Sequence, residues 1–66
     1  MSQNPLRLRI NGEDRSLSGP LTVAELLAAL EVDPRQVGVE RNKTLVRKAE
    51  FPNVRLVDGD ELAKFL

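Results

Sequence analysis

The sequence of 66 residues contains no cysteine and no histidine. Without these side chains it has no disulfide, no thiolate nucleophile, no imidazole for acid–base catalysis and no zinc site of the common nitrogen–sulfur kind. Phe51 and Phe65 are its only aromatic residues, too few for a base-stacking platform. Ten basic and ten acidic residues give a formal net charge of zero, which disfavours bulk nucleic-acid binding. We therefore expect no cofactor, no metal and no nucleic-acid partner.

Long hydrophobic runs are also missing. Residues 1–5 contain no apolar stretch, so we expect no signal peptide, no membrane span and a cytoplasmic location. We interpret residues 1–66 as a single domain. A chain this small buries only about 60% of its unfolded surface, so its stability should be modest.

The clearest predicted element is a helix over residues 22–30. Its apolar residues have the i, i+3, i+4, i+7 spacing of one helical face: Val23, Leu26, Leu27 and Leu30. Thr22 and Glu25 have the spacing of a capping box, in which each side chain bonds the other's backbone N–H. We expect Asp33-Pro34 to end the helix, because the residue before proline is disfavoured in the helical region. The leucine stripe must pack on a sheet, because a single short helix is marginal in water.

Short segments of alternating polarity predict the strands of that sheet. The expected strands cover residues 6–10, 15–17, 37–41, 44–46 and 61–66. Asn11-Gly12 and Asn42-Lys43 are typical of tight hairpin turns. Leu62 and Phe65 are three positions apart, so a regular strand would place these two apolar residues on opposite faces. This leaves the register of the last strand open and allows a bulge. The predicted fold class is α+β, with one antiparallel-dominated sheet, one helix across one face and the last strand beside the first at the centre.

The candidates for catalysis are few. Asp58 and Asp60 flank Gly59 and are either a pair of catalytic carboxylates or a turn in which aspartates bond nearby backbone N–H groups. We favour the turn. The serines and threonines have no candidate base nearby other than carboxylates, so we predict no nucleophile and no enzymatic activity.

Basic residues gather around the third and fourth predicted strands. They are either a solvated rim, which we favour, or a docking patch for an acidic partner. The candidate partner-binding residues are Arg41, Lys43, Arg47, Lys48, Phe65 and Leu66. Exposed edge strands in a small sheet can also pair between chains, so we expect a monomer or a weak dimer.

Several short segments, in this order and near this spacing, carry a resemblance to a known family. They are Asn11-Gly12-Glu13, Thr22-Val23-Ala24-Glu25-Leu26-Leu27, Val39-Glu40-Arg41-Asn42, Val46 with Lys48, Phe51, and Leu56 followed by Asp58-Gly59-Asp60. Together they resemble the ThiS family of small sulfur carrier proteins of thiamine biosynthesis, across nearly the whole chain.

The resemblance implies a β-grasp, ubiquitin-like fold with a mixed four- to five-stranded sheet and one helix. It also implies a protein substrate, not an enzyme. In that family an E1-like enzyme, ThiF, adenylates a C-terminal Gly-Gly, sulfur replaces one carboxylate oxygen, and thiazole synthase, ThiG, takes the sulfur. Glycines suit such a tail because they have no side chain to obstruct a narrow channel. This sequence ends at Leu66 without Gly-Gly, so Leu66 is not assigned as the sulfur-bearing residue.

Three alternatives to the carrier function stay open at this point. The first is a β-grasp interaction module without a tail, which binds an E1-like or ThiG-like partner through its sheet. The second is the related MoaD-like small subunit of molybdopterin synthase. The third is a TGS-like RNA-associated domain, which the zero net charge and the few aromatic residues disfavour.

Overall fold

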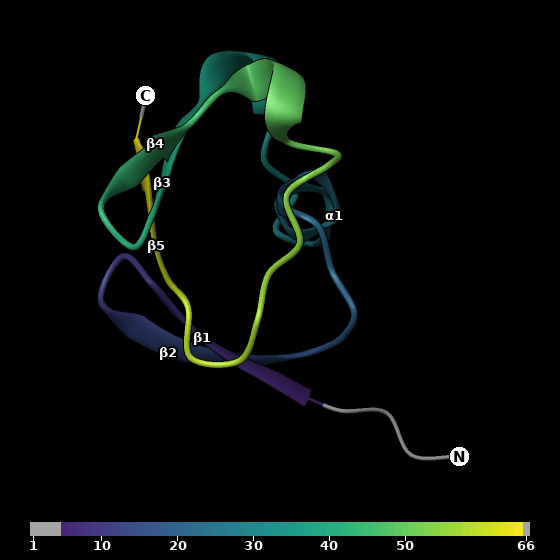
Figure 1. The fold of residues 1–66 in the computed structure, drawn as a ribbon, viewed down its shortest axis with the longest axis vertical. Coiled ribbons are helices and arrows are strands. Elements are labelled where there is room, and N and C mark those ends of the chain that lie inside the picture. The colour runs from purple at the N-terminus through teal and green to yellow at the C-terminus, as the bar shows by residue number, and fades with distance from the viewer. Residues whose placement is uncertain (1–4, 66) are drawn as a thin grey trace.

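The structure is a computed structural model that describes residues 5–65. It contains a five-stranded sheet and one α-helix, α1 (Val23–Ala29), which lies across one face (Figure 1). The strands are β1 (Pro5–Ile10), β2 (Glu13–Ser18), β3 (Gly38–Arg41), β4 (Thr44–Val46) and β5 (Glu61–Phe65). Two single 3₁₀ turns, η1 (Pro34–Gln36) and η2 (Lys48–Glu50), lie in the connections. None of the described helices has the length and hydropathy that a membrane span requires.

The strand order β2-β1-β5-β3-β4 places the last strand at the centre of the sheet. β5 runs parallel to β1 and antiparallel to β3, which confirms the predicted position beside the first strand. The β3–β5 register is continuous from Arg41↔Leu62 to Gly38↔Phe65. Successive residues of a strand point to opposite faces, so Leu62 and Phe65 lie on opposite sides of the sheet and their parity requires no bulge.

One hydrophobic core fills the space between the sheet and α1. Alternate residues of β1 enter it, while those between them are exposed. The buried apolar residues are Leu6, Leu8, Ile10, Val23, Leu26, Leu27, Val37, Val39, Phe51, Leu56 and Leu62. This set contains residues of the predicted helical stripe and of the predicted alternating strands, so the two periodicities identified both sides of the core correctly.

The start of α1 is as predicted and its end lies within one residue of the predicted position 30, whereas the predicted stop signal, Asp33-Pro34, is wrong. The Glu25 N–H donates to Thr22 Oγ1 at 3.2 Å, and the Thr22 N–H donates to Glu25 Oε1 at 2.8 Å, which completes the capping box. The helix ends at Ala29, before Asp33-Pro34, because Glu31 takes a left-handed conformation with φ of 60°. The Glu31 and Val32 N–H groups then bond the carbonyls of Ala28 and Leu27, which is the Schellman arrangement.

Other boundaries differ by a few residues from the prediction. β2 extends from residue 13 to 18 instead of 15 to 17, because the Asn11-Gly12 turn pairs Ile10 directly with Glu13. Both turn residues have positive φ, as a two-residue hairpin requires. β3 begins at Gly38, and the connection before it contains η1 instead of being a plain loop.

Residues 47–57 cross from the sheet edge over the start of α1. Phe51 is buried, and its carbonyl accepts the Ala24 N–H at 2.9 Å. The Val54 carbonyl accepts the Val23 N–H at 3.0 Å. The loop thus supplies hydrogen-bond acceptors for the first N–H groups of α1. The same bonds fix this polar, irregular segment against the helix.

Candidate functional site

The described candidate residues lie on β3, in the β3–β4 turn, in the segment after β4 and on β5. β3 and β5 are antiparallel, so Gly38 is opposite Phe65 and Arg41 is opposite Leu62. Lys43, in the β3–β4 turn, therefore lies beside the start of β5 and Phe65 at its end. The five candidates among residues 5–65 do not form one compact cluster, and the sixth, Leu66, lies outside the described residues.

Arg41 is held by a buried carboxylate. Its Nε donates to Asp60 Oδ2 at 2.9 Å, and the Asp60 side chain is only 4% exposed. The same carboxylate accepts the Val57 N–H at 2.9 Å and the Asn42 side-chain amide at 3.1 Å. Burial alone would raise the pKa of Asp60, but these hydrogen bonds outweigh it and hold the pKa below 3.8. Arg41 therefore has a structural partner that the sequence analysis did not assign.

The Asp58-Gly59-Asp60 segment is a turn, as favoured. Asp58 Oδ1 accepts the Arg7 N–H at 2.7 Å, and this bond is the main reason that its pKa lies below the usual value. Gly59 has φ of 92°, a conformation that glycine adopts readily. Each aspartate bonds a backbone N–H, so each has a structural role.

The other three cations differ in their surroundings. Lys48 Nζ donates to the Arg35 carbonyl at 2.8 Å, which ties η2 to η1. Lys43 has a left-handed φ of 71° in its turn and is exposed. Arg47 is exposed at the start of η2. Lys43 and Arg47 are therefore better placed to meet a partner than Arg41 and Lys48.

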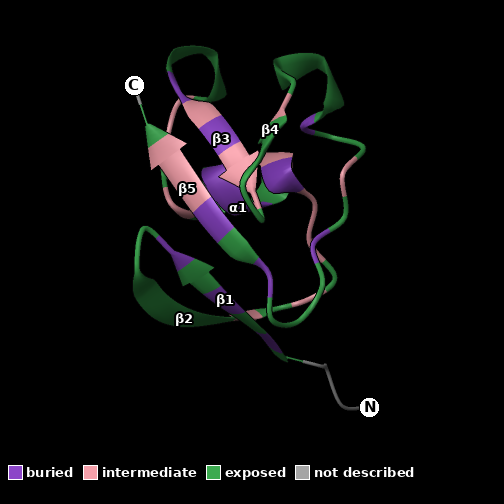
Figure 2. Cartoon of the chain, turned by 60° about the vertical axis from the view of Figure 1, so that its left-hand side comes forward, coloured by how far each residue is buried: buried purple, intermediate pink, exposed green. Residues whose placement is uncertain are grey.

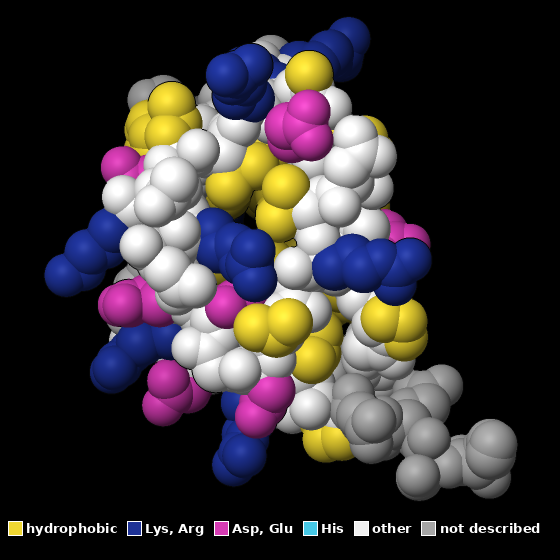
Figure 3. Space-filling view, in the orientation of Figure 1, with side chains coloured by type: hydrophobic (Ala, Val, Ile, Leu, Met, Phe, Trp, Pro, Cys, Tyr) yellow, Lys and Arg dark blue, Asp and Glu magenta, His cyan; other side chains and the backbone are white. Residues whose placement is uncertain are grey.

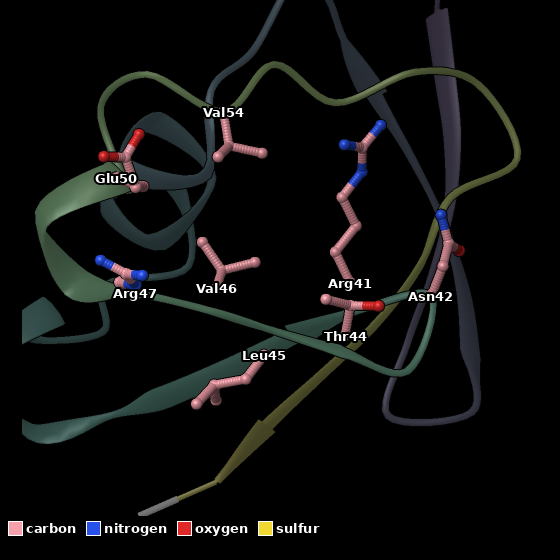
Figure 4. A pocket seen from close by; sticks show the side chains of 8 residues that line it. All are labelled: Arg41, Asn42, Thr44, Leu45, Val46, Arg47, Glu50 and Val54. Carbon is pink, nitrogen blue, oxygen red and sulfur yellow. The ribbon is translucent and has the colours of Figure 1, made fainter.

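A groove of about 710 Å³ runs between β4 and the loop at residues 47–54. We call it the β4 groove, and its lining residues are Arg41, Asn42, Thr44, Leu45, Val46, Arg47, Glu50 and Val54. Figure 4 shows Val46 and Val54 pointing into it, while Leu45 points away. Apolar side chains are visible in the hollow between sheet and loop, with basic side chains next to them (Figure 3). Arg41, Arg47 and Glu50 all line the groove, so the groove carries charges of both signs.

The side of the sheet that faces away from α1, here called the open face, carries exposed apolar side chains. Leu45 is 61% exposed and Phe65 is 47% exposed. The register places Leu45, Glu40 and Ala63 in one row, with Phe65 opposite Gly38 in the next. A Cβ atom on Gly38 would lie 2.6 Å from Phe65 Cε2, so the ring lies over this glycine. Figure 2 shows the ends of β5 exposed and its middle buried or half-buried.

Leu45 was not among the predicted candidates. A signal was present, because Val46 belongs to the core and its neighbour in a strand must point to the other face. Leu45 is therefore exposed on the open face. Exposed apolar residues that lie near one another, as Leu45 and Phe65 do, are typical of an interaction surface.

The described residues offer binding groups more than catalytic ones. Among residues 5–65, no group of three acidic side chains could hold a metal ion. The buried carboxylate in this region, Asp60, is fully engaged by hydrogen-bond donors. These bonds tie the start of β5 to β3 and to the loop before it.

Comparison with protein-family models gives one family. The model of the ThiS family matches residues 8–65. The match extends from β1 to the end of β5, and so covers nearly all of the described structure.

Solved structures with a similar fold include a thiamine biosynthesis protein, ThiS, from Geobacter metallireducens. Its crystal structure has a TM-score of 0.83 and 32% identity, with 92% of this chain and 96% of that chain covered. The solution structure of a thiamine biosynthesis protein from the same organism has a TM-score of 0.78 and 34% identity, with 92% and 81% covered. The five-stranded mixed sheet with one helix is therefore the β-grasp fold of ThiS.

A relative of known description is the thiazole synthase of Paramagnetospirillum magneticum. The two sequences are 47% identical over 57 residues, which is 86% of this chain. The chain spans only 18% of the length of that protein.

Proposed function

Since the chain belongs to the ThiS family, we propose that it is the folded domain of a sulfur carrier for the thiazole part of thiamine. The observation that carries this proposal is the family match from residue 8 to residue 65. In this role the protein is a substrate of other enzymes and not a catalyst, and it acts in the cytoplasm.

A sulfur carrier needs a rigid body and a terminal carboxylate that other proteins can reach. β5 has a partner strand on each side, so the chain leaves the fold from the centre of the sheet. In the proposed reaction an adenylating enzyme activates the terminal carboxylate, and sulfur then replaces one of its oxygens. In the first step the terminal carboxylate attacks the α-phosphate of ATP and releases pyrophosphate; in the second the sulfur donor displaces AMP from the acyl-adenylate. The carrier thus contributes only its terminal carboxylate, and the active sites for both steps are assigned to the partner enzymes.

The proposed partners are a ThiF-like adenylating enzyme and a ThiG-like thiazole synthase. Support for the second is the relative described as a thiazole synthase, which includes a segment similar to this chain. The similar segment makes up 18% of that protein, so most of its length lies outside the segment.

We propose the open face around Phe65 as the docking surface for these enzymes. Leu45 and Phe65 supply apolar area near the end of β5. Lys43, Arg47 and Lys48 are proposed as the basic residues at its margin, and Arg41 as a contact from the β4 groove on the other side of the sheet. Rim charges act mainly on the association rate, and we expect Lys43 and Arg47 to contribute most, because Arg41 is held by Asp60 and Lys48 by the Arg35 carbonyl.

The carrier function is tested by the intact mass of the natural protein from its source cells, with and without incubation with its adenylating enzyme, ATP and a sulfur donor. We expect a fraction that is heavier by the exchange of one oxygen for one sulfur at the C-terminal carboxyl group. A natural protein that never acquires this mass under either condition would refute the carrier function.

The docking surface is tested separately by measuring the affinity of the chain for thiazole synthase. Phe65→Ser and Leu45→Ser should each weaken binding roughly tenfold, as expected when an exposed apolar side chain becomes buried in an interface. Val57→Ser is the matched control, because Val57 is 53% exposed but lies in the loop before β5. Equal losses for all three variants would exclude a specific role of the open face.

A further inference from the structure

The two neighbours of β5 do not accompany it equally far. On one side, β3 pairs with β5 as far as Phe65. On the other side, the β1 ladder stops at Ile10↔Leu62, because β1 turns into the hairpin at Asn11. The last three residues of β5 would therefore lack a partner on the β1 side if only the strands paired.

Asn11 extends this ladder past the end of β1. Its backbone N–H donates to the Leu62 carbonyl at 2.9 Å. Its side-chain Oδ1 accepts the Lys64 N–H, also at 2.9 Å. The Asn11 side-chain oxygen thus occupies the place that a backbone carbonyl would have if the β1 ladder continued. It satisfies the Lys64 N–H, which would otherwise face solvent.

The second hairpin repeats this device at the other end of β5. Asn42 also begins a two-residue turn, and both asparagines have φ of 51°. The Asn42 N–H donates to the Glu61 carbonyl at 2.7 Å, and its Oδ1 accepts the Glu61 N–H at 3.0 Å. Glycine would satisfy the geometry of both turns. Because each turn instead begins with an asparagine whose side chain bonds β5, the geometry points to a role for that side chain.

We propose that Asn11 is a positioning residue that fixes the end of β5 and thereby sets the place and direction in which the chain leaves the sheet. This inference depends on the proposed carrier function, because only a carrier must present its C-terminal carboxylate to another enzyme's active site. Small displacements of a reacting group can lower a rate by large factors. Asn11 acts through the backbone of Lys64 and touches no reacting atom.

The test uses two substitutions that separate turn geometry from hydrogen bonding. Asn11→Gly keeps the left-handed turn but removes the acceptor. Asn11→Asp keeps both, because aspartate also tolerates positive φ and offers a carboxylate oxygen. Amide hydrogen exchange by NMR should become about fivefold faster at Lys64 in Asn11→Gly, as loss of one hydrogen bond implies. The Glu61 amide, which Asn42 holds, and the amides of the core should be unchanged, and Asn11→Asp should resemble the wild type.

The functional readout is the adenylation of the natural protein by its adenylating enzyme. Asn11→Gly should lower kcat roughly tenfold with little change in KM, because the docking surface is intact while the carboxylate is less well placed. Unchanged exchange at Lys64 would overturn the structural part of the inference. Faster exchange with an unchanged kcat would overturn the positioning role. If the wild type itself is not adenylated, the proposed function fails together with this role, whereas the exchange result still decides whether Asn11 holds β5.

Discussion

The buried carboxylate of Asp60 offers a demanding test of how this small fold is held together. Its two oxygens receive three donors from two segments: the Arg41 guanidinium and the Asn42 amide from the end of β3 and its turn, and the Val57 N–H from the loop before β5. In Asp60→Asn, one oxygen becomes an NH₂ group. If that group replaces Oδ1, it faces the NH₂ of Asn42, which cannot rotate without losing its bond to the Glu61 N–H. The substitution therefore removes at least one bond to a charged acceptor in either orientation.

The expected loss is about 2 kcal/mol at neutral pH, the usual contribution of a hydrogen bond to a buried charged group. A domain of this length is stable by only roughly 3–10 kcal/mol, so the loss is a large share. In urea denaturation, with a slope of about 1 kcal/mol per molar for so small a protein, the midpoint should fall by about 2 M. Asp58→Asn is the matched control, because Asp58 is exposed and asparagine can still accept the Arg7 N–H. Its midpoint should change little.

The effect of Asp60→Asn should depend on pH in a defined direction. The pKa of Asp60 is below 3.8 in the folded protein, because its hydrogen bonds outweigh the effect of burial. A carboxyl group with a lowered pKa stabilises the fold above the unfolded-state pKa, and this contribution disappears as the pH falls through the folded-state value. The difference between wild type and variant should be full at pH 7 and shrink below about pH 4. Asp33 and Asp58 also have lowered pKa values, but both proteins contain them, so they cancel. A loss below about 0.5 kcal/mol, or one that stays constant into acid, would refute this account of the carboxylate.

Five further substitutions test the packing and the ends of the elements by urea or thermal unfolding. Leu26→Ala should cost about 2–5 kcal/mol because it leaves a cavity between α1 and the sheet, and an unchanged midpoint would contradict the core assignment. Thr22→Ala should cost about 1 kcal/mol through loss of the capping box, so a loss near zero would mean that the cap is not important. Glu31→Gly should stabilise by roughly 0.5–1 kcal/mol, since glycine adopts φ of 60° without strain; a destabilised variant would argue against this helix end. Gly38→Ala should destabilise because its Cβ meets the Phe65 ring, and Phe65→Ala should relieve most of that loss, whereas additive effects would show that the two positions do not interact.

Features that depend on neighbouring residues were predictable from the sequence. The capping box needs only Thr22 and Glu25 at the right spacing, and the first hairpin needs only Asn11-Gly12 between alternating segments. The central position of the last strand was also predictable. Its register was not, because pairing between the two ends of the chain is decided by packing and not by local preference.

The features that were missed depend on an unusual backbone conformation or on contacts between distant parts of the chain. Glu31 takes a left-handed conformation that favours glycine, so the helix ends earlier than Asp33-Pro34 suggested. Arg41 was grouped with surface cations because the sequence does not show that Asp60 is buried beneath it. Asn11 and Asn42 were correctly assigned to turns, but their bonds to β5 depend on contacts across the fold.

The central place of β5 also determines when this protein can fold during its synthesis. Among residues 5–65, the β1–β2 and β3–β4 hairpins are joined within the sheet only through β5, which is translated after the other four strands. A nascent chain on the ribosome therefore has two separate hairpins and one short helix, each marginal alone, until this strand has left the exit tunnel. Folding of the sheet therefore waits for β5, and a chain that terminates before this strand stays open to proteases.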